Sequence, residues 1–215
     1  MYTVPVQAPE ATLDRVLIVS PLAEWAERYR VVRRRAFSRY GVSTVLGNHE
    51  ETSARASRIA IVLGMREDVV LSGVSVHRAA CIRGIDLPSA VMLEGIGREW
   101  SVLTPGTVEL SGTMRGRLAK RQDVEIMLEV AVSAIAFFGA DAVGTAPDHM
   151  KGRYAELGFE PCPHLASFEY PAGMTTTPMV MRDPVRMPLA DGSARERMLA
   201  WRDRLQPWVP TMGER

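Results

Sequence analysis

Two spacings of apolar residues divide the first half of the chain into predicted strands and helices. Residues 15–19 (RVLIV) are rich in β-branched residues and predict a strand. Residues 58–63 and 69–77 are rich in Val and Ile and predict an antiparallel hairpin with a loop at 64–68. Gly73, inside the second of these strands, predicts a bulge or a close approach to the backbone. Between the strand at 15–19 and the hairpin, Pro21 opens a segment with helical spacing. Its apolar positions are Leu22, Trp25, Tyr29, Val32 and Phe37.

The second half of the chain continues this alternation. Residues 107–111 predict a strand and residues 140–145 a buried strand. Residues 165–170 and 178–181 predict two late strands, and residues 193–205 predict a helix. The long irregular interval at 79–106, with a short helix at 87–94, is typical of a substrate-binding segment. The strongest helical pattern precedes Gly139, and its apolar face consists of Val124, Met127, Leu128, Ala131, Ile135 and Phe138.

These elements predict one α/β domain with appended ends. A length of 215 residues is enough for a single domain with a full core, and 47% hydrophobic and 24% charged residues are typical of a soluble globular protein. We expect a flexible lead at 1–14, a domain at 15–183, and an extension with a helix at 184–215. A polar loop is expected at 41–57.

Composition and spacing argue against several classes of protein. A net charge of +1 gives no reason to expect a nucleic-acid partner. Cys81 and Cys162 have no CxxC or Cys/His spacing, and His77 and His164 have no ligand-spaced partners, so we expect no metal site and a reducing cytoplasm. The first ten residues do not resemble a secretory signal. The longest apolar run, at 130–140, falls short of the roughly 20 residues that cross a bilayer.

A short helix predicted at 149–157 places one tyrosine beside the end of a strand. Asp148 is a predicted cap, Gly158 a predicted left-handed stop, and Pro161 prevents the helix from resuming. A phenol at that place suits a proton donor, which makes Tyr154 a candidate catalytic residue. The alternative is a core aromatic, because Met150, Tyr154 and Leu157 also follow helical spacing.

The pattern Pro-x-His-x4-Tyr-x2-Leu-Gly-Phe, which begins at Pro147, resembles the last conserved helix of the GNAT acyltransferase superfamily. It is most similar to the branch of N-acyl amino acid synthases and acyl-homoserine-lactone synthases. The resemblance implies a GNAT fold over about 15–181, with a mixed, mostly antiparallel sheet, helices on both faces, and a V-shaped cleft between two splayed central strands, 107–111 and 140–145. In that family the tyrosine protonates the departing thiolate, and Tyr154 occupies its place.

A basic loop before the long helix is the candidate phosphate site. Free backbone amides and the positive end of a helix dipole attract anions. The usual GNAT loop reads Gln/Arg-x-x-Gly-x-Gly/Ala, whereas Leu118 and Lys120 stand here where glycines are expected, which favours a thioester carried on a protein over acetyl-CoA. The alternative is a solvated basic turn. The candidate ligands are Arg115, Gly116, Arg117, Lys120 and Arg121.

Glu109 is the candidate for orienting or deprotonating an incoming amine; the alternative is a strand carboxylate that faces water. The sequence Glu-Leu-Ser-Gly at 109–112 is similar to the Glu-x-Ser-Arg of acyl-homoserine-lactone synthases, with Gly112 in place of the arginine. His149 is a second candidate base, since an imidazole titrates near pH 6.5. Its alternative is a first-turn residue that holds a loop.

The resemblance implies an N-acyltransferase that moves a medium or long fatty acyl group from an acyl-carrier-protein or acyl-CoA thioester to a small amine, such as an amino acid. No tightly bound cofactor is expected. Two alternatives stay open: an acyl-homoserine-lactone synthase that uses S-adenosylmethionine, and a non-catalytic acyl-thioester-binding protein. An acceptor carboxylate would pair with Arg98 or with the arginine-rich first helix, whose cations otherwise form a solvated face or a dock for an acidic carrier protein: Arg28, Arg30, Arg33, Arg34, Arg35 and Arg39.

Overall fold

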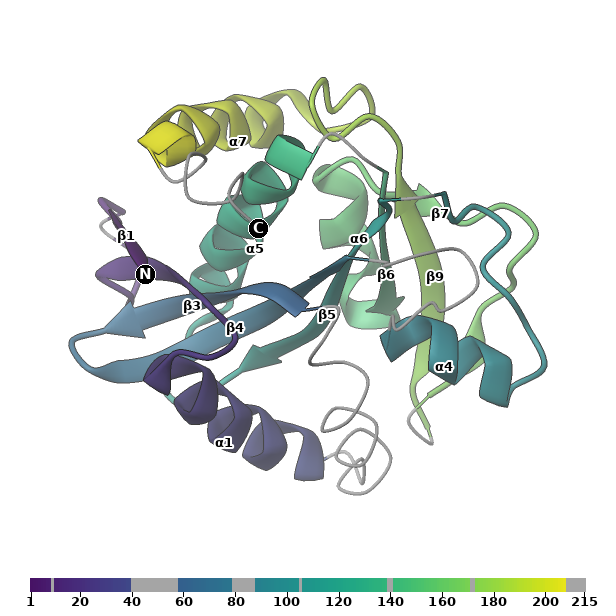
Figure 1. The fold of residues 1–215 in the computed structure, drawn as a ribbon, viewed down its shortest axis with the longest axis horizontal. Coiled ribbons are helices and arrows are strands. Elements are labelled where there is room, and N and C mark those ends of the chain that lie inside the picture. Colours follow the sequence, from purple (N-terminus) through teal and green to yellow (C-terminus); the bar gives the residue numbers. More distant parts are fainter. Residues whose placement is uncertain are drawn as a thin grey trace.

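The computed structural model describes residues 1–8, 10–39, 58–78, 88–104, 106–138, 141–170 and 173–207. Its nine strands form one sheet in the order β1-β2-β3-β4-β5-β6-β9-β7, with β8 also paired to β9 (Figure 1). Neighbouring strands are antiparallel except β5 and β6, which are parallel. The strands are β1 (Tyr2–Pro5), β2 (Arg15–Val19), β3 (Arg58–Arg66), β4 (Val69–Arg78), β5 (Val108–Arg115), β6 (Ala142–Pro147), β7 (Glu160–Pro161), β8 (Phe168–Glu169) and β9 (Thr175–Met181).

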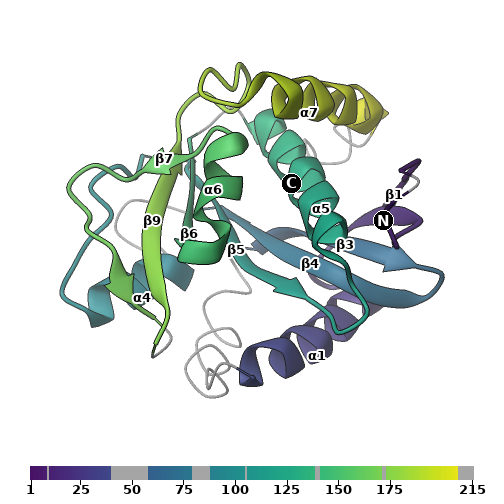
Figure 2. The same ribbon diagram turned by 180° about the vertical axis from the view of Figure 1, so that it is seen from behind.

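Helices cover both faces of this sheet (Figures 1 and 2). On one face, α1 (Glu24–Ser38) packs on β2, β3 and β5, and α4 (Pro88–Gly95) packs on β6 and β9. On the other face lie α5 (Arg121–Ile135), α6 (Asp148–Glu156) and α7 (Gly192–Leu205), and a short 3-10 turn, Ala136–Phe138, continues α5. The predicted fold class, a mixed and mostly antiparallel sheet with helices on both faces, is confirmed.

The two central strands diverge at the middle of the sheet. β5 and β6 pair only where Val108 to Leu110 lie opposite Ala142 to Gly144. Beyond that point β5 stays paired with β4, while β6 stays paired with β9 as far as Pro147. The pairing of β5 and β6 therefore shows the splayed central strands that the family resemblance implied.

A β-bulge lies on β5 just past this divergence. Ser75 of β4 pairs with Ser111, and Gly73 pairs with Met114, so two β5 residues stand opposite one β4 residue. Gly112 is one of the two, and its φ of 67° is a backbone conformation that favours glycine. Tyr29 of α1 holds the bulge in place, because its hydroxyl donates to the Gly112 carbonyl (2.9 Å) and accepts from Ser75 Oγ (3.1 Å).

Gly64 and Gly73 both lie inside strands, at places where another side chain packs closely against the backbone. The predicted loop at 64–68 was too long, because β3 continues to Arg66 and only Glu67 and Asp68 form the turn. Gly64 pairs with Ser72 of β4, and a Cβ there would lie 2.3 Å from Ser72 Oγ. At Gly73 the predicted close approach is confirmed, since a Cβ would lie 2.8 Å from the Tyr29 ring.

The N-terminal residues are ordered into the sheet, where the sequence analysis expected a flexible lead at 1–14. β1 pairs with β2 and buries Val4. The carboxylate of Asp123 on α5 accepts hydrogen bonds from the backbone amides of Thr12 (2.7 Å) and Leu13 (3.1 Å). These long-range partners fix the segment, and its own composition gave no sign of them. The loop expected at 41–57 and most of the interval between β4 and α4 lie outside the described residues.

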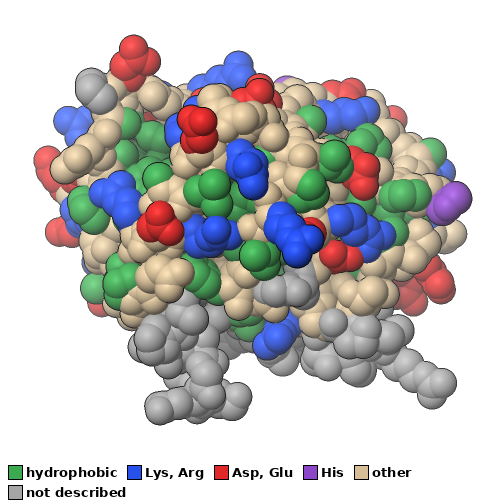
Figure 3. All heavy atoms as spheres, turned by 90° about the horizontal axis from the view of Figure 1, so that it is seen from above, with side chains coloured by type: hydrophobic (Ala, Val, Ile, Leu, Met, Phe, Trp, Pro, Cys, Tyr) green, Lys and Arg blue, Asp and Glu red, His purple; other side chains and the backbone are tan. Residues whose placement is uncertain are grey.

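Among the described residues, no helix is long and apolar enough to cross a membrane. On the face seen in Figure 3, basic and acidic side chains are intermixed, as the net charge of +1 implies. At the C-terminal end, the predicted helix at 193–205 is confirmed as α7, and Asp191 caps it by accepting from the amides of Ser193 (3.0 Å) and Ala194 (3.4 Å).

Candidate active site

Tyr154 is buried at the point where β5 and β6 diverge. Its side chain is 3% exposed, and its ring packs against β6, where a Cβ on Gly144 would lie 3.4 Å from the ring. The Phe159 ring lies edge-on to it at 5.2 Å between centroids. The helix begins at Asp148 and not, as predicted, after a cap at that residue: Pro147 is the cap position. Gly158 adopts the predicted left-handed conformation, with φ of 97°.

The Tyr154 hydroxyl points to the β5 bulge. It lies 3.4 Å from Thr113 Oγ1, the residue after Gly112. Burial raises the pKa of Tyr154, and the nearby Glu109 adds to this, while the Thr113 contact acts in the opposite direction. A phenol with a raised pKa keeps its proton at neutral pH, so the Tyr154 hydroxyl has a proton that it can donate.

Glu109 is also fully buried, which excludes the water-facing alternative. Its carboxyl accepts hydrogen bonds from the backbone amide (3.1 Å) and the hydroxyl of Ser89, in the first turn of α4. Burial raises the pKa of Glu109 to about 8, although both Ser89 hydrogen bonds and the charge of Arg33 act to lower it. The group is therefore neutral at pH 7 and becomes a base in mildly alkaline solution.

His77 stands next to Glu109, and the sequence analysis did not predict this. The two residues are directly paired across β4 and β5, so their side chains share one face of the sheet, and His77 is fully buried. Sequence reasoning tested His77 only for metal-ligand spacing. No group of three or more His, Cys, Asp or Glu in the described part of the chain could hold a metal ion.

Arg33 of α1 enters the site from the same face as Glu109. The residue is 4% exposed, and its guanidinium covers Gly112, where a Cβ would lie 2.4 Å from Arg33 Cζ. The rings of Tyr29 and Phe37 flank it, with centroids 6.0 and 5.3 Å from Cζ. Sequence reasoning treated the α1 arginines as one set. The available signal was spacing, because Arg33 is four residues from each of these aromatics and so lies on the buried stripe.

The predicted phosphate loop is only partly free to bind an anion. The Gly116 amide donates to the Leu71 carbonyl (2.7 Å), and the Lys120 amide donates to Asp123 (2.7 Å). The Lys120 ammonium donates to the Glu10 carbonyl (3.2 Å), and Arg121 pairs with Glu125. The Asp123 carboxylate already occupies the start of α5, where the helix dipole would favour a phosphate. Arg115 and Arg117 are exposed.

His149 is placed apart from Tyr154. It is exposed on the first turn of α6, five residues before the buried tyrosine. Five residues at 3.6 per turn put the two side chains about 140° apart around the helix axis. The structure therefore brings Tyr154 and Glu109 together and leaves His149 outside this group.

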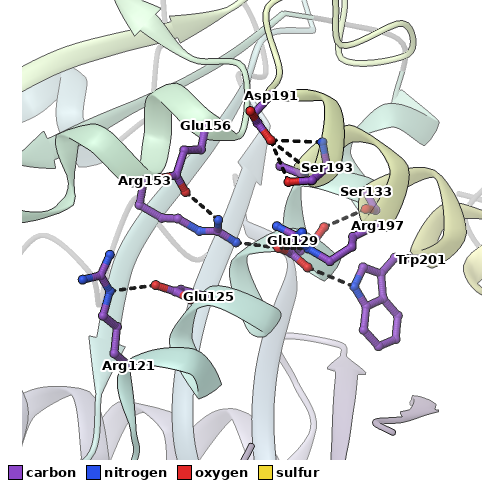
Figure 4. A network of polar contacts seen from close by, with 11 residues as sticks. Arg121, Glu125, Glu129, Ser133, Arg153, Glu156, Asp191, Ser193, Arg197 and Trp201 are labelled. Carbon is purple, nitrogen blue, oxygen red and sulfur yellow. Dashed lines mark hydrogen bonds and ion pairs between the residues drawn. The ribbon is translucent and has the colours of Figure 1, made fainter. Parts of the chain in front are cut away.

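A buried ion-pair network anchors the helix that carries Tyr154 (Figure 4). Glu129 of α5 is 4% exposed and accepts from Arg153 of α6 at 2.5 Å and from Arg197 of α7 at 2.9 Å. Trp201 Nε1 of α7 also donates to Glu129, at 3.4 Å. Arg153 immediately precedes Tyr154 in the chain. Through Glu129, α5 and α7 therefore hold α6 in place next to the tyrosine.

Comparisons with known proteins agree with this fold. No protein-family model matches the chain, and no curated protein sequence matches it. Among solved structures, FeeM, an N-acyl amino acid synthase from uncultured soil microbes, has a TM-score of 0.57 at 11% identity and covers 79% of this chain and 95% of its own. TofI has a TM-score of 0.54 at 15% identity and covers 84% and 95%. A second TofI structure is a ternary complex with an inhibitor and MTA.

A third similar structure is the GNAT family N-acetyltransferase YhbS from Escherichia coli in complex with CoA. It has a TM-score of 0.50 at 12% identity, over 86% of this chain and 90% of its own. These similarities confirm that the chain has the GNAT-type acyltransferase fold that the tyrosine motif implied.

The titration of Glu109 should be visible in stability and, if Glu109 is the base, in activity. Because the pKa in the folded protein, about 8, exceeds that of an exposed carboxyl, the folded state holds the extra proton. Stability should therefore fall as pH rises between about 4.5 and 8, with a slope of up to about 1.4 kcal/mol per pH unit, and level off above pH 8. Urea unfolding across this range measures the slope.

Glu109→Gln should remove this part of the pH dependence, since an amide does not titrate. Glu94→Gln is the matched control, because Glu94 is exposed on the adjacent helix α4. An unchanged slope in Glu109→Gln would show that Glu109 is ionised in the folded protein at neutral pH. Burial raises the pKa of Glu109, and the hydrogen bonds from Ser89 and the charge of Arg33 act against it; His77 is its neighbour across the strands.

Proposed function

We propose that the protein is an N-acyltransferase that moves a medium or long fatty acyl group from a thioester to a small amine such as an amino acid. One observation carries this proposal. A buried phenol, Tyr154, lies beside the β5 bulge on one face of a GNAT-type sheet, and a buried carboxyl, Glu109, lies on the same strand before Gly112 and faces the other side. An acyl transfer to an amine needs both groups, because the amine loses a proton and the leaving thiolate gains one.

The proposed reaction is direct attack. The amine nitrogen forms a bond to the thioester carbonyl carbon, backbone amides at the bulge stabilise the oxyanion, and the carbon–sulfur bond then breaks. Glu109 takes the proton from the amine, and Tyr154 gives its proton to the sulfur. No enzyme nucleophile is needed, and burial raises the pKa of the Cys162 thiol, which disfavours the thiolate that covalent catalysis would require.

The proposed donor is an acyl thioester of an acyl carrier protein or of CoA, held as a co-substrate. The absence of the usual loop glycines at Leu118 and Lys120 favours the carrier protein, because only one phosphate must then be held. The CoA complex of YhbS supports the CoA donor. We place the reaction in the cytoplasm, where the buried Cys162 would stay reduced.

A second candidate function is an acyl-homoserine-lactone synthase that uses S-adenosylmethionine. The MTA bound in the TofI complex supports this candidate. Gly112 argues against it, because it stands where that family has an arginine. A third candidate is a non-catalytic protein that binds acyl thioesters.

One assay separates the three. The protein is incubated with decanoyl-CoA or decanoyl acyl carrier protein, a pool of L-amino acids, and S-adenosylmethionine, and products are identified by mass spectrometry. We expect N-decanoyl amino acids and no methylthioadenosine. Lactone with stoichiometric methylthioadenosine would establish the second function, and no product with either donor would leave the non-catalytic function.

Charge reversal in the basic loop should weaken donor binding. We expect Arg115→Glu and Arg117→Glu to raise the Michaelis constant for the acyl donor far more than that for the amine, because both side chains are exposed beside the start of α5. With an acidic carrier protein the effect should grow at low salt, since charges interact over about 10 Å at 0.1 M.

Arg195→Glu is the matched control for this pair. It reverses an exposed arginine on α7, on the opposite side of α5 from the sheet. Donor constants that do not change with the two loop variants would exclude this loop from donor binding.

A further inference from the structure

The hydroxyl of Tyr29 makes two hydrogen bonds that the packing of its ring does not require. Tyr29 is fully buried on α1, and its ring packs against Gly73 of β4. The hydroxyl donates to the Gly112 carbonyl at 2.9 Å and accepts from Ser75 Oγ at 3.1 Å. A phenylalanine would fill the same space without these bonds, so the polar end of the side chain needs an explanation of its own.

The Tyr29 hydroxyl bonds to a peptide of β5 that lies in a gap of the strand ladder. The pairing of β5 with β4 is interrupted between Ser111 and Met114. Gly112 and Thr113 fill this gap, and Gly112 has a φ of 67°. Because glycine has no Cβ, steric contacts restrict the direction of the peptide that follows it only weakly. The hydrogen bond from Tyr29 therefore selects one direction for the Gly112–Thr113 peptide.

That direction turns the Thr113 amide toward the face of the sheet that carries Tyr154. In a trans peptide the carbonyl oxygen and the following N–H point in opposite directions. Since the Gly112 carbonyl points to Tyr29 on the α1 face, the Thr113 N–H points away from α1. The other face carries α6 and Tyr154 (Figures 1 and 2), and the Thr113 hydroxyl lies 3.4 Å from the Tyr154 hydroxyl.

The bulge is also the part of the β5 interior that solvent reaches. Residues 111–113 are half-buried, and they lie between a buried run at 108–110 and the buried Met114. The same residues follow the point where β5 and β6 diverge. A thioester that enters between the two strands would therefore meet the Thr113 amide and the Tyr154 hydroxyl together.

We propose that Tyr29 is a positioning residue for acyl transfer: its hydroxyl, held by Ser75, keeps the Thr113 N–H directed at the thioester oxygen. This inference rests on the proposed function. The oxygen gains negative charge when the amine nitrogen bonds to the carbonyl carbon, and it loses that charge when the carbon–sulfur bond breaks. A fixed N–H therefore stabilises the transition state more than the bound thioester. Tyr29 acts from the far side of the strand and exchanges no proton with the substrate.

Tyr29→Phe tests this role by separating kcat from the Michaelis constant. The variant keeps the buried ring, so we expect it to fold. Its kcat for amide formation from a decanoyl thioester should be about ten- to a hundredfold lower, because the N–H is no longer held in its direction. The Michaelis constant for that thioester should stay the same, since the lost interaction belongs to the transition state. An unchanged kcat, with or without a raised Michaelis constant, would overturn the inference.

Ser75→Ala and Tyr2→Phe are the companion variants. Ser75→Ala removes the bond that orients the Tyr29 hydroxyl, and the two bonds form one chain. The double variant should therefore be no slower than Tyr29→Phe alone, whereas additive losses would overturn the role of Ser75. Tyr2→Phe removes a phenol that also donates to a backbone carbonyl, that of Arg204 at 2.7 Å, and it should leave kcat unchanged.

The infrared band of a bound thioester carbonyl tests the same contact without turnover. Decanoyl-CoA with an isotope label at its carbonyl carbon is mixed with the whole protein in the absence of an amine. An N–H donor polarises the carbonyl and weakens its double bond. We therefore expect the band to lie at a lower frequency in the wild-type protein than in Tyr29→Phe. Equal frequencies in the two proteins would overturn the inference.

The two measurements separate this inference from the proposed function. If amides form and Tyr29→Phe turns over as fast as wild type, the function stands and the inference fails. If no amide forms but the carbonyl band differs between wild type and Tyr29→Phe, the positioned amide stands and the transfer reaction fails.

Discussion

Tyr154→Phe should lower turnover by about ten- to a thousandfold while the protein stays folded. The change deletes the hydroxyl that lies 3.4 Å from Thr113 Oγ1 and keeps the ring that packs on Gly144 and Phe159. Without that proton the sulfur must leave as a bare thiolate from a buried site, which raises the barrier of the step. The measurement is kcat for amide formation from a decanoyl thioester, with the thermal midpoint of unfolding recorded beside it.

Tyr2→Phe is the matched control for this variant. It removes another phenolic hydroxyl, which donates to the Arg204 carbonyl at the far edge of the sheet, and it should leave turnover unchanged. Wild-type turnover in Tyr154→Phe would remove this residue from the mechanism and leave it as a core aromatic.

Glu129→Ala should cost about 3–5 kcal/mol of unfolding free energy, the largest loss of stability expected for a single substitution here. The carboxylate is buried with Arg153, which is 7% exposed, and removing it leaves that cation without its buried counter-charge. Arg197 and Trp201 of α7 lose the same acceptor. Urea unfolding measures the change, and turnover should fall as well, because α6 loses the contact that precedes Tyr154.

Glu156→Ala tests whether burial is the cause. Glu156 also pairs with Arg153, at 2.7 Å, but it is 52% exposed, so its loss should cost less than about 1 kcal/mol. Similar losses in the two variants would mean that the network acts as a surface ion pair and does not anchor α6.

The elements with strong local patterns were predictable, and their ends were not. Residues 15–19 and α7 were located almost to the residue, because periodicity and caps are local signals. β5 runs four residues beyond its predicted end, because a bulge stabilised by Tyr29 of another element carries the strand through Gly112. β1 was missed because its hydrogen-bond partners are on β2, and the segment that joins the two strands is held by Asp123, more than a hundred residues away.

The same distinction applies to the site. Tyr154 and Glu109 could be named as candidates from the sequence, because a motif and a residue type single them out. Ser89 and His77 became candidates only through contacts: a helix start that reaches a carboxyl, and a strand register that pairs two side chains. Such contacts between distant segments leave no periodic pattern in the chain.

The convergence of two faces on one bulge also suggests how to block the protein. Tyr154 reaches Thr113 from the α6 side, and Arg33 covers the neighbouring Gly112 from the α1 side. An inhibitor that joins an acyl-pantetheine chain to an amino acid through an uncleavable carbon linkage would span both sides at once. Its two halves share one tether, so the second half binds at a high effective concentration, and the whole molecule should exceed either half in affinity by about a hundredfold or more.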